Sequence, residues 1–247
     1  MSGILLKDRE RIDDLHRNNY KIIQHPDYFT FGMDAVLLSD FVAVHKNETH
    51  MDLCCGNGVI PILLAAKNKG ASYAGAEINK KLADMAVRSA ALNGLGGKIA
   101  IHNIDIRAIE GCAVLGDSFD VVTANPPYMA VDTGATNENY DMAIARHEIL
   151  CNLDDVAAAA AKLLRYGGRF YMVHRPGRLA DIMTVLRKYR LEPKTLRFVQ
   201  PKAAAAPNTL LIAAVKGGKP HLNVKPPLIV YDDKGQYTKE IHRIYYE

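Results

Sequence analysis

Between residues 50 and 215 the sequence alternates short apolar runs with longer stretches that have helical character. The apolar runs are bounded by glycine, proline, asparagine or aspartate, which is typical of buried strands. Strands that alternate with helices predict a parallel sheet between two layers of helices. The predicted fold is therefore α/β, a three-layer Rossmann-like fold whose sheet has seven strands and is mostly parallel. We expect strands at 50–54, 72–78, 98–104, 119–124, 169–174, 195–199 and 209–215, and helices at 59–69, 80–92, 107–114, 154–164 and 178–189.

The last two strands follow each other without a helical stretch, so they predict an antiparallel hairpin at one edge of the sheet. Residues 4–17 mix apolar and charged side chains and predict one or two turns of amphipathic helix. Asp34 is placed to cap a helix over 35–41. The length fits a single domain, 1–247, with an N-terminal extension, 1–48, that packs on the cofactor site, and a C-terminal tail, 218–247.

The composition predicts a soluble protein, with 49% hydrophobic and 23% charged residues. No apolar run approaches the ~18 residues that a membrane span needs, and the amino terminus has no apolar signal core, so we expect a cytoplasmic protein. Nothing in the sequence indicates an obligate protein partner, and we expect a monomer. The cysteines lack a chelating spacing and no H-E-x-x-H occurs, so we expect reduced thiols and no metal site. These cysteines are Cys54, Cys55, Cys112 and Cys151.

The formal net charge of +4 is unevenly distributed along the chain. Residues 162–225 contain 14 Lys and Arg but only two acids, Asp181 and Glu192. Such a segment predicts a cationic surface for a polyanion. The alternative is that a helix near 176–190 merely exposes a solvated charged face.

Residues 123–128, Thr-Ala-Asn-Pro-Pro-Tyr, mark the point where a buried strand must end. Neither proline can donate a hydrogen bond to a neighbouring strand, so the chain leaves the sheet at Asn125. The strand thus delivers the Asn125 amide, the Pro126 carbonyl and the Tyr128 ring to the carboxyl edge of the sheet. Open α/β sheets bind their ligands at this edge.

A glycine-rich turn, Asp-Leu-Cys-Cys-Gly-Asn-Gly at 52–58, lies between an expected strand and an expected helix. The turn has neither the third glycine of a dinucleotide site nor the lysine of a phosphate loop. Asp52 would repel a polyphosphate but attract a sulfonium or an amino group. Glu77 and Asp105 end the next two strands, where they can bind a ribose and an adenine amino group. Three acids at successive strand ends favour a positively charged nucleoside, which indicates S-adenosyl-L-methionine.

These motifs resemble the ordered motif set of class I S-adenosyl-L-methionine-dependent methyltransferases that modify amino groups. Residues 29–38, 145–148 and 216–219 narrow the resemblance to the bacterial enzymes that methylate adenine N6 in valine tRNA at position 37, next to the anticodon. The resemblance covers nearly the whole chain and implies tRNA as the partner. Two features depart from the family pattern. Cys54 replaces the usual first glycine of the turn, which suggests that this position need not be glycine, and the alanines at 203–206 replace a segment expected to be more basic.

The resemblance also implies the roles of the site residues. The Asn125 side-chain oxygen and the Pro126 carbonyl would accept the two N–H bonds of the target amine, and Tyr128 would stack on the base. Arg146, His147 and Arg175 would contact RNA, although His147 can equally pack at the start of the following helix. The implied cofactor site comprises Asp52, Cys54, Gly56, Gly58, Glu77, Ile78, Asp105, Ile106 and Asn125, together with Phe31, Gly32 and Asp34.

Three alternatives stay open. A protein glutamine-N5 methyltransferase uses the same acceptor motif, although such enzymes carry an amino-terminal helical bundle for which this chain has no room. A ribosomal-RNA guanine-N2 methyltransferase is the second alternative. From a different class, the chain can be a non-catalytic RNA-binding protein with a relict cofactor pocket. The intact motif at 125–128 argues against that reading.

Overall fold

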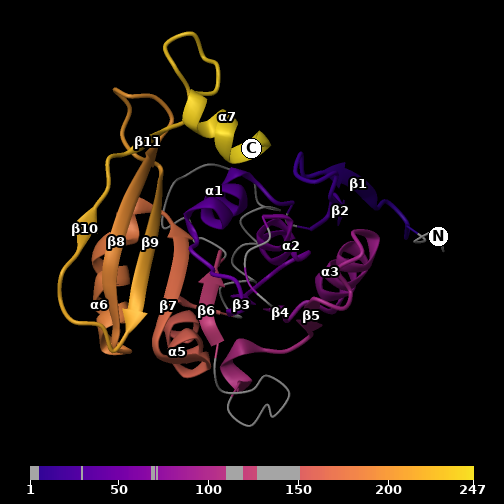
Figure 1. Cartoon of the computed structure of the whole chain (residues 1–247), viewed down its shortest axis with the longest axis horizontal. Helices are drawn as coiled ribbons and strands as arrows, with labels where there is room; N and C mark the ends of the chain where they lie inside the picture. Colours follow the sequence, from indigo (N-terminus) through magenta and orange to yellow (C-terminus); the bar gives the residue numbers. More distant parts are fainter. Residues whose placement is uncertain (1–5, 29, 68–69, 71, 110–118, 127–150) are drawn as a thin grey trace.

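A mixed sheet of nine strands forms the centre of the described structure (Figure 1). The computed structural model describes residues 6–28, 30–67, 70, 72–109, 119–126 and 151–247. The sheet order is β10-β8-β9-β7-β6-β3-β4-β5, and β11 pairs with β8. The strands are β3 Thr49–Leu53, β4 Ser72–Ala76, β5 Ile99–His102, β6 Phe119–Ala124, β7 Leu164–His174, β8 Leu191–Gln200, β9 Thr209–Lys216, β10 Asn223–Val224 and β11 Leu228–Ile229.

Strands β5, β4, β3, β6 and β7 are parallel, and β9 runs antiparallel to both β7 and β8. The α/β class and the antiparallel hairpin at one edge are therefore confirmed. The seven predicted strands are all present, and the short strands β10 and β11 extend the sheet along β8. The helices are α1 Met33–Phe41, α2 Val59–Ala66, α3 Lys80–Leu92, α5 Leu153–Leu163, α6 Leu179–Lys188 and α7 Lys239–Tyr246, with 3₁₀ turns η1 Ile106–Ala108 and η2 Pro176–Arg178.

Two hydrophobic cores cover the two faces of the sheet. One core combines side chains of α1, α2 and α7 with one face of the strands. The other combines α5, α6 and η1 with the opposite face. Alanine dominates α5, and its small side chains let the helix approach the sheet closely. Helix α5 begins with a capping box between Asn152 and Asp155, which satisfies N–H groups at its first turn.

The amphipathic helix predicted for residues 4–17 is wrong in its described part. Residues Arg11–Asp14 form strand β1, which pairs antiparallel with β2, Lys21–Gln24. The connecting turn has left-handed backbone at His16, Asn18 and Asn19, and asparagine tolerates this conformation well. The chain therefore reverses direction where a helix would have continued.

Other differences are smaller. The helix expected over 107–114 is described only as η1, because 110–118 lie outside the described residues. Strand β7 begins directly after α5, with an irregular register opposite Phe119, where a longer break was expected. The C-terminal tail, expected to be irregular, contains β10, β11 and α7. The polar loop that begins at Tyr128 lies outside the described residues.

Many of the basic side chains in residues 162–225 are paired with acidic side chains, so this segment presents fewer unpaired cations than its sequence predicts. Within the part of the chain that the structure describes, six of its cations form salt bridges, and four of the acidic partners come from outside the segment. Folding thus places acids beside these cations, which a linear charge count cannot show. The pairs are Arg165–Asp120, Arg169–Glu48, Arg178–Asp181, Arg187–Glu192, Lys188–Asp154 and Arg197–Glu240.

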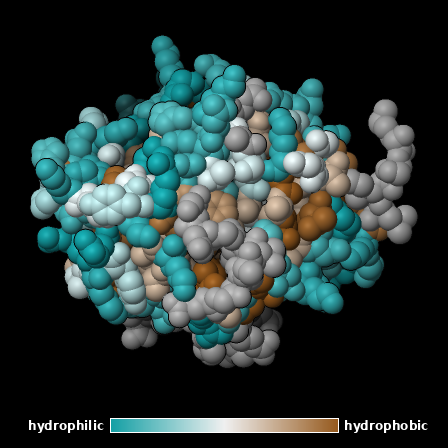
Figure 2. Space-filling view, turned by 60° about the horizontal axis from the view of Figure 1, so that its bottom comes forward, coloured by the Kyte–Doolittle hydropathy of each residue, from teal (hydrophilic) through white to brown (hydrophobic). Residues whose placement is uncertain are grey.

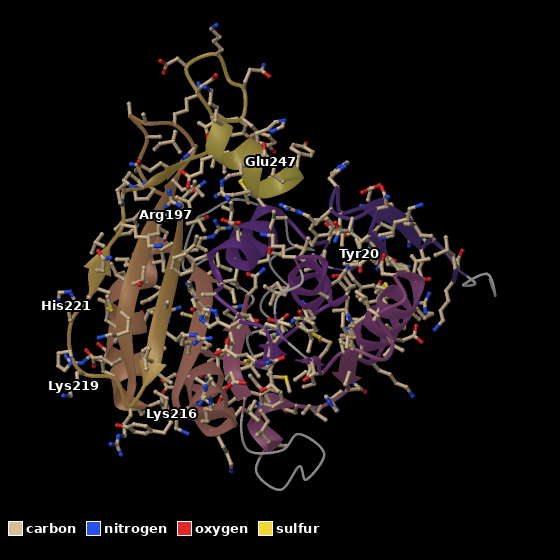
Figure 3. The ribbon with its side chains drawn as sticks, in the orientation of Figure 1. Tyr20, Arg197, Lys216, Lys219, His221 and Glu247 are labelled. Atoms are coloured by element: carbon tan, nitrogen blue, oxygen red, sulfur yellow. The ribbon has the colours of Figure 1, made fainter. Side chains whose placement is uncertain are left out.

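The surface is largely polar on the face shown in Figure 2, where hydrophobic residues gather in a central band. None of the helices in the described ranges has both the length and the apolar character that a bilayer crossing requires. Figure 3 shows Arg197 towards the end of the sheet that carries α7, and Lys216 towards the opposite end.

Candidate active site

The carboxyl ends of the parallel strands β3, β4 and β6 bring the predicted motifs to one edge of the sheet. Strand β3 lies between β4 and β6, and Asp52 is in register with Gly75 on one side and Thr123 on the other. Because the carboxyl ends of parallel neighbours meet at the same edge, the turn after β3 lies beside Glu77 and Asn125. This is where ligands bind in open α/β sheets.

The turn after β3 has a backbone that favours glycine. Gly56 and Gly58 have φ angles of 56° and 83°. A Cβ added to Gly58 would lie 3.1 Å from the Cβ of Ala86 in α3, so this position also permits close helix packing. The Asn57 side chain donates to the Ile23 carbonyl at 3.1 Å, which ties the turn to β2 in the N-terminal extension.

Cys54 shares this left-handed backbone, with φ of 57°, although it is not glycine. A non-glycine residue in this conformation carries a strain of about 1–2 kcal/mol. The Cys54 thiol lies 3.9 Å from the thiol of Cys151, the residue that precedes the N-cap of α5. Cysteine at position 54 therefore strains the backbone, and its contact with the Cys151 thiol offsets part of this strain.

We expect Cys54→Gly to leave the free energy of unfolding almost unchanged, because relief of strain offsets the lost thiol contact. Cys54→Val is expected to destabilise the protein by about 1–3 kcal/mol, since a β-branched residue fits the left-handed region poorly. Urea denaturation of both variants measures the difference. Equal stability of the two variants would contradict the assigned backbone strain.

Glu77 follows β4 and holds the glycine turn in place. Its carboxylate accepts hydrogen bonds from the backbone N–H of Gly56 at 2.9 Å and of Asn79 at 2.8 Å. Asn103, after β5, donates to the carbonyls of Glu77 and Ile78 at 2.8 and 2.9 Å. The carboxylate is buried, so the backbone fixes its orientation. Asn103 was not singled out from the sequence, because an asparagine after a strand is common in turns.

Asp105 and Ile106 follow β5, which ends at His102; Asp105 is the N-cap of η1 and Ile106 its first residue. The Asp105 carboxylate accepts from the Arg107 backbone N–H at 2.9 Å and forms an ion pair with the Arg107 guanidinium. The Arg107 guanidinium holds the pKa of Asp105 below its usual range. Ile106 is buried under α5. Asp105 therefore remains ionised, and it is already paired with its neighbour.

Asp52 belongs to a buried chain of polar groups that sequence reasoning missed. The Thr123 hydroxyl donates to Asp52 Oδ1 at 2.6 Å, and the Nε2 of His50 lies 2.8 Å from the same hydroxyl. With the hydroxyl proton directed at Asp52, the His50 Nε2–H donates to Thr123. All three side chains are at most 1% exposed. The sequence feature that could have indicated this network is the occurrence of two polar residues, His50 and Thr123, within otherwise apolar strands.

The two titratable groups of this chain have strongly shifted pKa values. Burial raises the pKa of Asp52 to about 8, the Thr123 hydrogen bond opposes this shift, and the charge of Glu77 adds to it. Burial lowers the pKa of His50 to about 3, so its imidazole stays neutral at physiological pH. Among the described residues, no group donates a hydrogen bond to Asp52 Oδ2. When Asp52 is ionised, its buried Oδ2, at the edge of the sheet where ligands bind, is complementary to a cation.

The residues at this edge fit S-adenosyl-L-methionine. The cofactor carries an ammonium group and a positive sulfur, and the orphaned Oδ2 of Asp52 offers them a buried acceptor. The glycine turn leaves room for close approach, because a Cβ added at Gly56 would meet no atom of the described residues within 4 Å. Glu77 presents a second carboxylate beside the same turn. No lysine of the turn itself is available for a polyphosphate.

Asn125 and Pro126 follow β6 directly, and Pro126 is buried. Because Thr123 in the same strand bonds to Asp52, the backbone that carries Asn125 is fixed next to the cofactor edge. The remaining predicted substrate residues Tyr128, Arg146 and His147 lie outside the described residues.

Phe31, Gly32 and Asp34 come from the start of α1 and do not form one group. The Phe31 N–H donates to the Gln24 side chain at 3.0 Å, which links Phe31 to β2. Asp34 instead accepts from the Thr209 hydroxyl at 3.5 Å. Gly32 is the exposed residue that precedes α1.

Arg175, a predicted substrate residue, is exposed at the end of β7, where it donates to the Asn208 carbonyl at 3.1 Å. Its Nη1 also lies 3.4 Å from the Thr209 hydroxyl, so it neighbours Asp34 rather than the glycine turn. In the described ranges no cluster of three or more His, Cys, Asp or Glu side chains is arranged to hold a metal ion.

Curated relatives of similar length match most of the chain. The tRNA1(Val) (adenine(37)-N6)-methyltransferase of Dickeya chrysanthemi (strain Ech1591) is 24% identical over 218 residues, which cover 86% of this chain and 85% of the relative. The enzyme of the same name from Porphyromonas gingivalis (strain ATCC BAA-308 / W83) is 28% identical over 221 residues, which cover 86% of each chain.

Solved structures show the same fold. A predicted O-methyltransferase from Agrobacterium tumefaciens matches with a TM-score of 0.71 and 22% identity, covering 86% of this chain and 95% of that one. A ribosomal protein L11 methylase from Lactobacillus delbrueckii subsp. bulgaricus matches with a TM-score of 0.52 and 19% identity, covering 75% and 78%. The model of the methyltransferase small domain family matches residues 20–192, well over half of the sequence. The chain therefore belongs to the methyltransferase small domain family.

Proposed function

We propose that the protein transfers a methyl group from S-adenosyl-L-methionine to the N6 amino group of an adenine in tRNA, the adenine at position 37 beside the anticodon of valine tRNA. The observation that carries the proposal is the position of Asn125 at the end of β6, next to the strand that bears Asp52. Relatives named for this activity match nearly the whole chain.

In the proposed reaction Asn125 and Pro126 hold the target amine. An exocyclic aromatic amine is a weak nucleophile because its lone pair is delocalised into the ring. Acceptors on both N–H bonds favour a pyramidal nitrogen whose lone pair is available, and no prior deprotonation is needed. The lone pair would form the N–C bond as the C–S bond breaks, S-adenosyl-L-homocysteine would leave, and the amine would afterwards lose one N–H proton to solvent. The Asn125 side-chain oxygen and the Pro126 carbonyl supply these acceptors, and proline holds its carbonyl in a fixed direction.

The buried carboxylates orient the cofactor. S-adenosyl-L-methionine supplies, when bound, a methyl group on a positively charged sulfur. Asp52 would hold its cationic end and Glu77 its ribose, and the glycine turn would let the backbone approach it closely. Positioning and electrostatics therefore supply most of the rate enhancement. Tyr128 completes the proposed site by stacking on the base.

The direct test is to incubate the purified protein with isotopically labelled S-adenosyl-L-methionine and bulk tRNA from a strain in which the gene has been deleted. Digestion and mass spectrometry are expected to find the label in N6-methyladenosine, in valine tRNA only. Label in a guanine of ribosomal RNA or in a protein glutamine would contradict the proposal and support the corresponding alternative. Binding of the cofactor without any transfer would identify a relict pocket.

A further inference from the structure

Three tyrosines near the C-terminus form a continuous stack of rings, which we call the tyrosine stack. The rings of Tyr231 and Tyr237 have centroids 5.4 Å apart and planes inclined by 20°. Those of Tyr237 and Tyr245 are 5.7 Å apart and inclined by 17°. Tyr231 and Tyr237 are 36% and 39% exposed, whereas Tyr245 packs against the core, so the stack joins an exposed aromatic surface to the core.

The backbone holds this stack rigidly. Thr238 N–H donates to the Val230 carbonyl at 3.0 Å, and Tyr231 N–H donates to the Pro201 carbonyl at 2.9 Å. Arg197 in β8 makes two hydrogen bonds of 2.9 Å to Glu240 in the first turn of α7. A preorganised aromatic surface loses little conformational entropy when a ligand stacks on it.

The stack lies at the same edge of the sheet as the proposed methyl-transfer site. Strand β8 runs parallel to β7, because both strands pair antiparallel with β9, and the Tyr231 N–H donates to the carbonyl of Pro201, just beyond the carboxyl end of β8. Strand β9 begins at this edge with Thr209, which lies beside Arg175 at the end of β7. Strand β7 pairs with β6, which ends at Asn125. Figures 1 and 3 show α7 and its terminal Glu247 at this end of the sheet.

The charge around the stack is almost balanced. Residues 231–247 contain three Lys and Arg against four Asp and Glu. The Asp232 carboxylate is used within the loop, where it accepts from the N–H of Lys234 and of Gln236 at 2.9 Å each. This segment has no excess of positive charge, and its exposed rings suit it to the flat faces of bases. Unstacked RNA bases are recognised in this way, on aromatic side chains.

We propose that the tyrosine stack binds an unpaired RNA base that flanks the target adenine. The inference rests on the proposed function, because the RNA is the substrate held at Asn125. A base in the loop next to the target would stack on the outer face of Tyr231, which ends the stack, while the target adenine lies at the end of β6. The tyrosine stack would then hold the RNA loop with its bases unstacked next to the proposed methyl-transfer site.

The test compares Tyr231→Leu and Tyr237→Leu with Tyr231→Phe and Tyr237→Phe. Leucine removes the ring and phenylalanine keeps it, so we expect the leucine variants to weaken tRNA binding by ~5–100-fold and the phenylalanine variants to bind like the wild type. The matched control is Tyr166→Leu. Tyr166 is 74% exposed at the opposite end of the sheet, where its hydroxyl donates to the Gly217 carbonyl at 3.1 Å.

Two further readouts separate stacking from a structural effect. The slope of log Kd against log salt concentration is expected to stay the same in the leucine variants, because no phosphate contact is removed. A single-stranded RNA with 2-aminopurine next to the target position is expected to lose fluorescence on binding to the wild type but not to Tyr231→Leu. Tyr231→Leu serves as the deciding variant if Tyr237→Leu fails to fold, because Tyr231 lies at the end of the stack.

The outcomes distinguish this inference from the proposed function. A wild-type protein that methylates tRNA, together with a Tyr231→Leu variant that binds and quenches equally, would overturn the tyrosine stack as a base-binding surface. A wild-type protein that quenches the 2-aminopurine RNA in a ring-dependent way but transfers no methyl group to tRNA would support the stack and overturn the proposed reaction.

Discussion

Replacing Asn125 by alanine is expected to lower kcat about a hundredfold or more, with little change in the Kd of S-adenosyl-L-methionine. The side-chain oxygen of Asn125 acts on the target amine, so its loss affects the chemical step. The cofactor contacts assigned to Asp52 and Glu77 remain. Single-turnover methylation measures the rate and isothermal titration calorimetry measures cofactor affinity.

Asn103→Ala is the matched control for this variant. Asn103 is also an asparagine just beyond a parallel strand, but it donates to the Glu77 and Ile78 carbonyls beside the cofactor turn. Its removal is expected to weaken cofactor binding while kcat at saturating cofactor stays near that of the wild type. An Asn125→Ala enzyme with more than about a tenth of the wild-type rate would refute the role given to this amide.

Cofactor affinity is expected to rise with pH up to about pH 8, and Asp52 is the cause. The Asp52 pKa is raised to about 8, so below that pH the carboxyl must lose its proton before it can attract a cation. One released proton gives at most about a tenfold gain in affinity per pH unit. His50, with its pKa lowered to about 3, stays neutral throughout this range and contributes nothing.

Asp52→Asn is the control that isolates this proton. The amino group of the cofactor titrates near pH 8 as well, and the variant retains that contribution while it loses the one from Asp52. Calorimetry from pH 6 to 9 is therefore expected to give a shallower slope for Asp52→Asn and weaker binding at pH 8. Identical slopes in the two proteins would show that Asp52 does not face the cationic group.

The ligand-free protein provides an independent check with the opposite sign. An unfolded aspartate has a pKa of about 3.9, so raising it in the folded state stabilises the fold at low pH and loses that contribution as pH rises towards 8. Asparagine does not ionise, so Asp52→Asn is expected to keep its stability as the pH rises towards 8. Its free energy of unfolding is expected to exceed that of the wild type at pH 8, and the excess is expected to shrink as the pH falls.

The residues at the carboxyl edge of the sheet could be predicted from the sequence, whereas the buried hydrogen bonds among His50, Thr123 and Asp52 could not. The prolines after Asn125 and the alternation of strands and helices depend on local backbone rules, so strand β6 and its exit were predictable. The contact between Glu77 and Gly56 follows from the adjacency of consecutive strands. The pairing of Thr123 with Asp52 depends on register across the sheet, which no local pattern reveals.

The N-terminal β-hairpin was missed because left-handed asparagines, which reverse the chain, look like ordinary polar residues in a helical pattern. The ion pairs that residues 162–225 form with Glu48 and Glu240 were also not predictable, because these acids lie far away in the sequence. Both features depend on tertiary context.

Strand β6 lies between β3 and β7, with hydrogen bonds to a neighbour on each side. Asp52 of β3 lies opposite Thr123, two residues before Asn125, so the position of the Asn125 amide relative to this carboxylate is set by strand register and by the spacing of adjacent strands, about 4.8 Å. Donor and acceptor groups are assembled by folding and need no domain closure to meet. A relative that acquires a different amino substrate can keep this pair of strands unchanged, and its selectivity then has to evolve in the loops and at the outer strands.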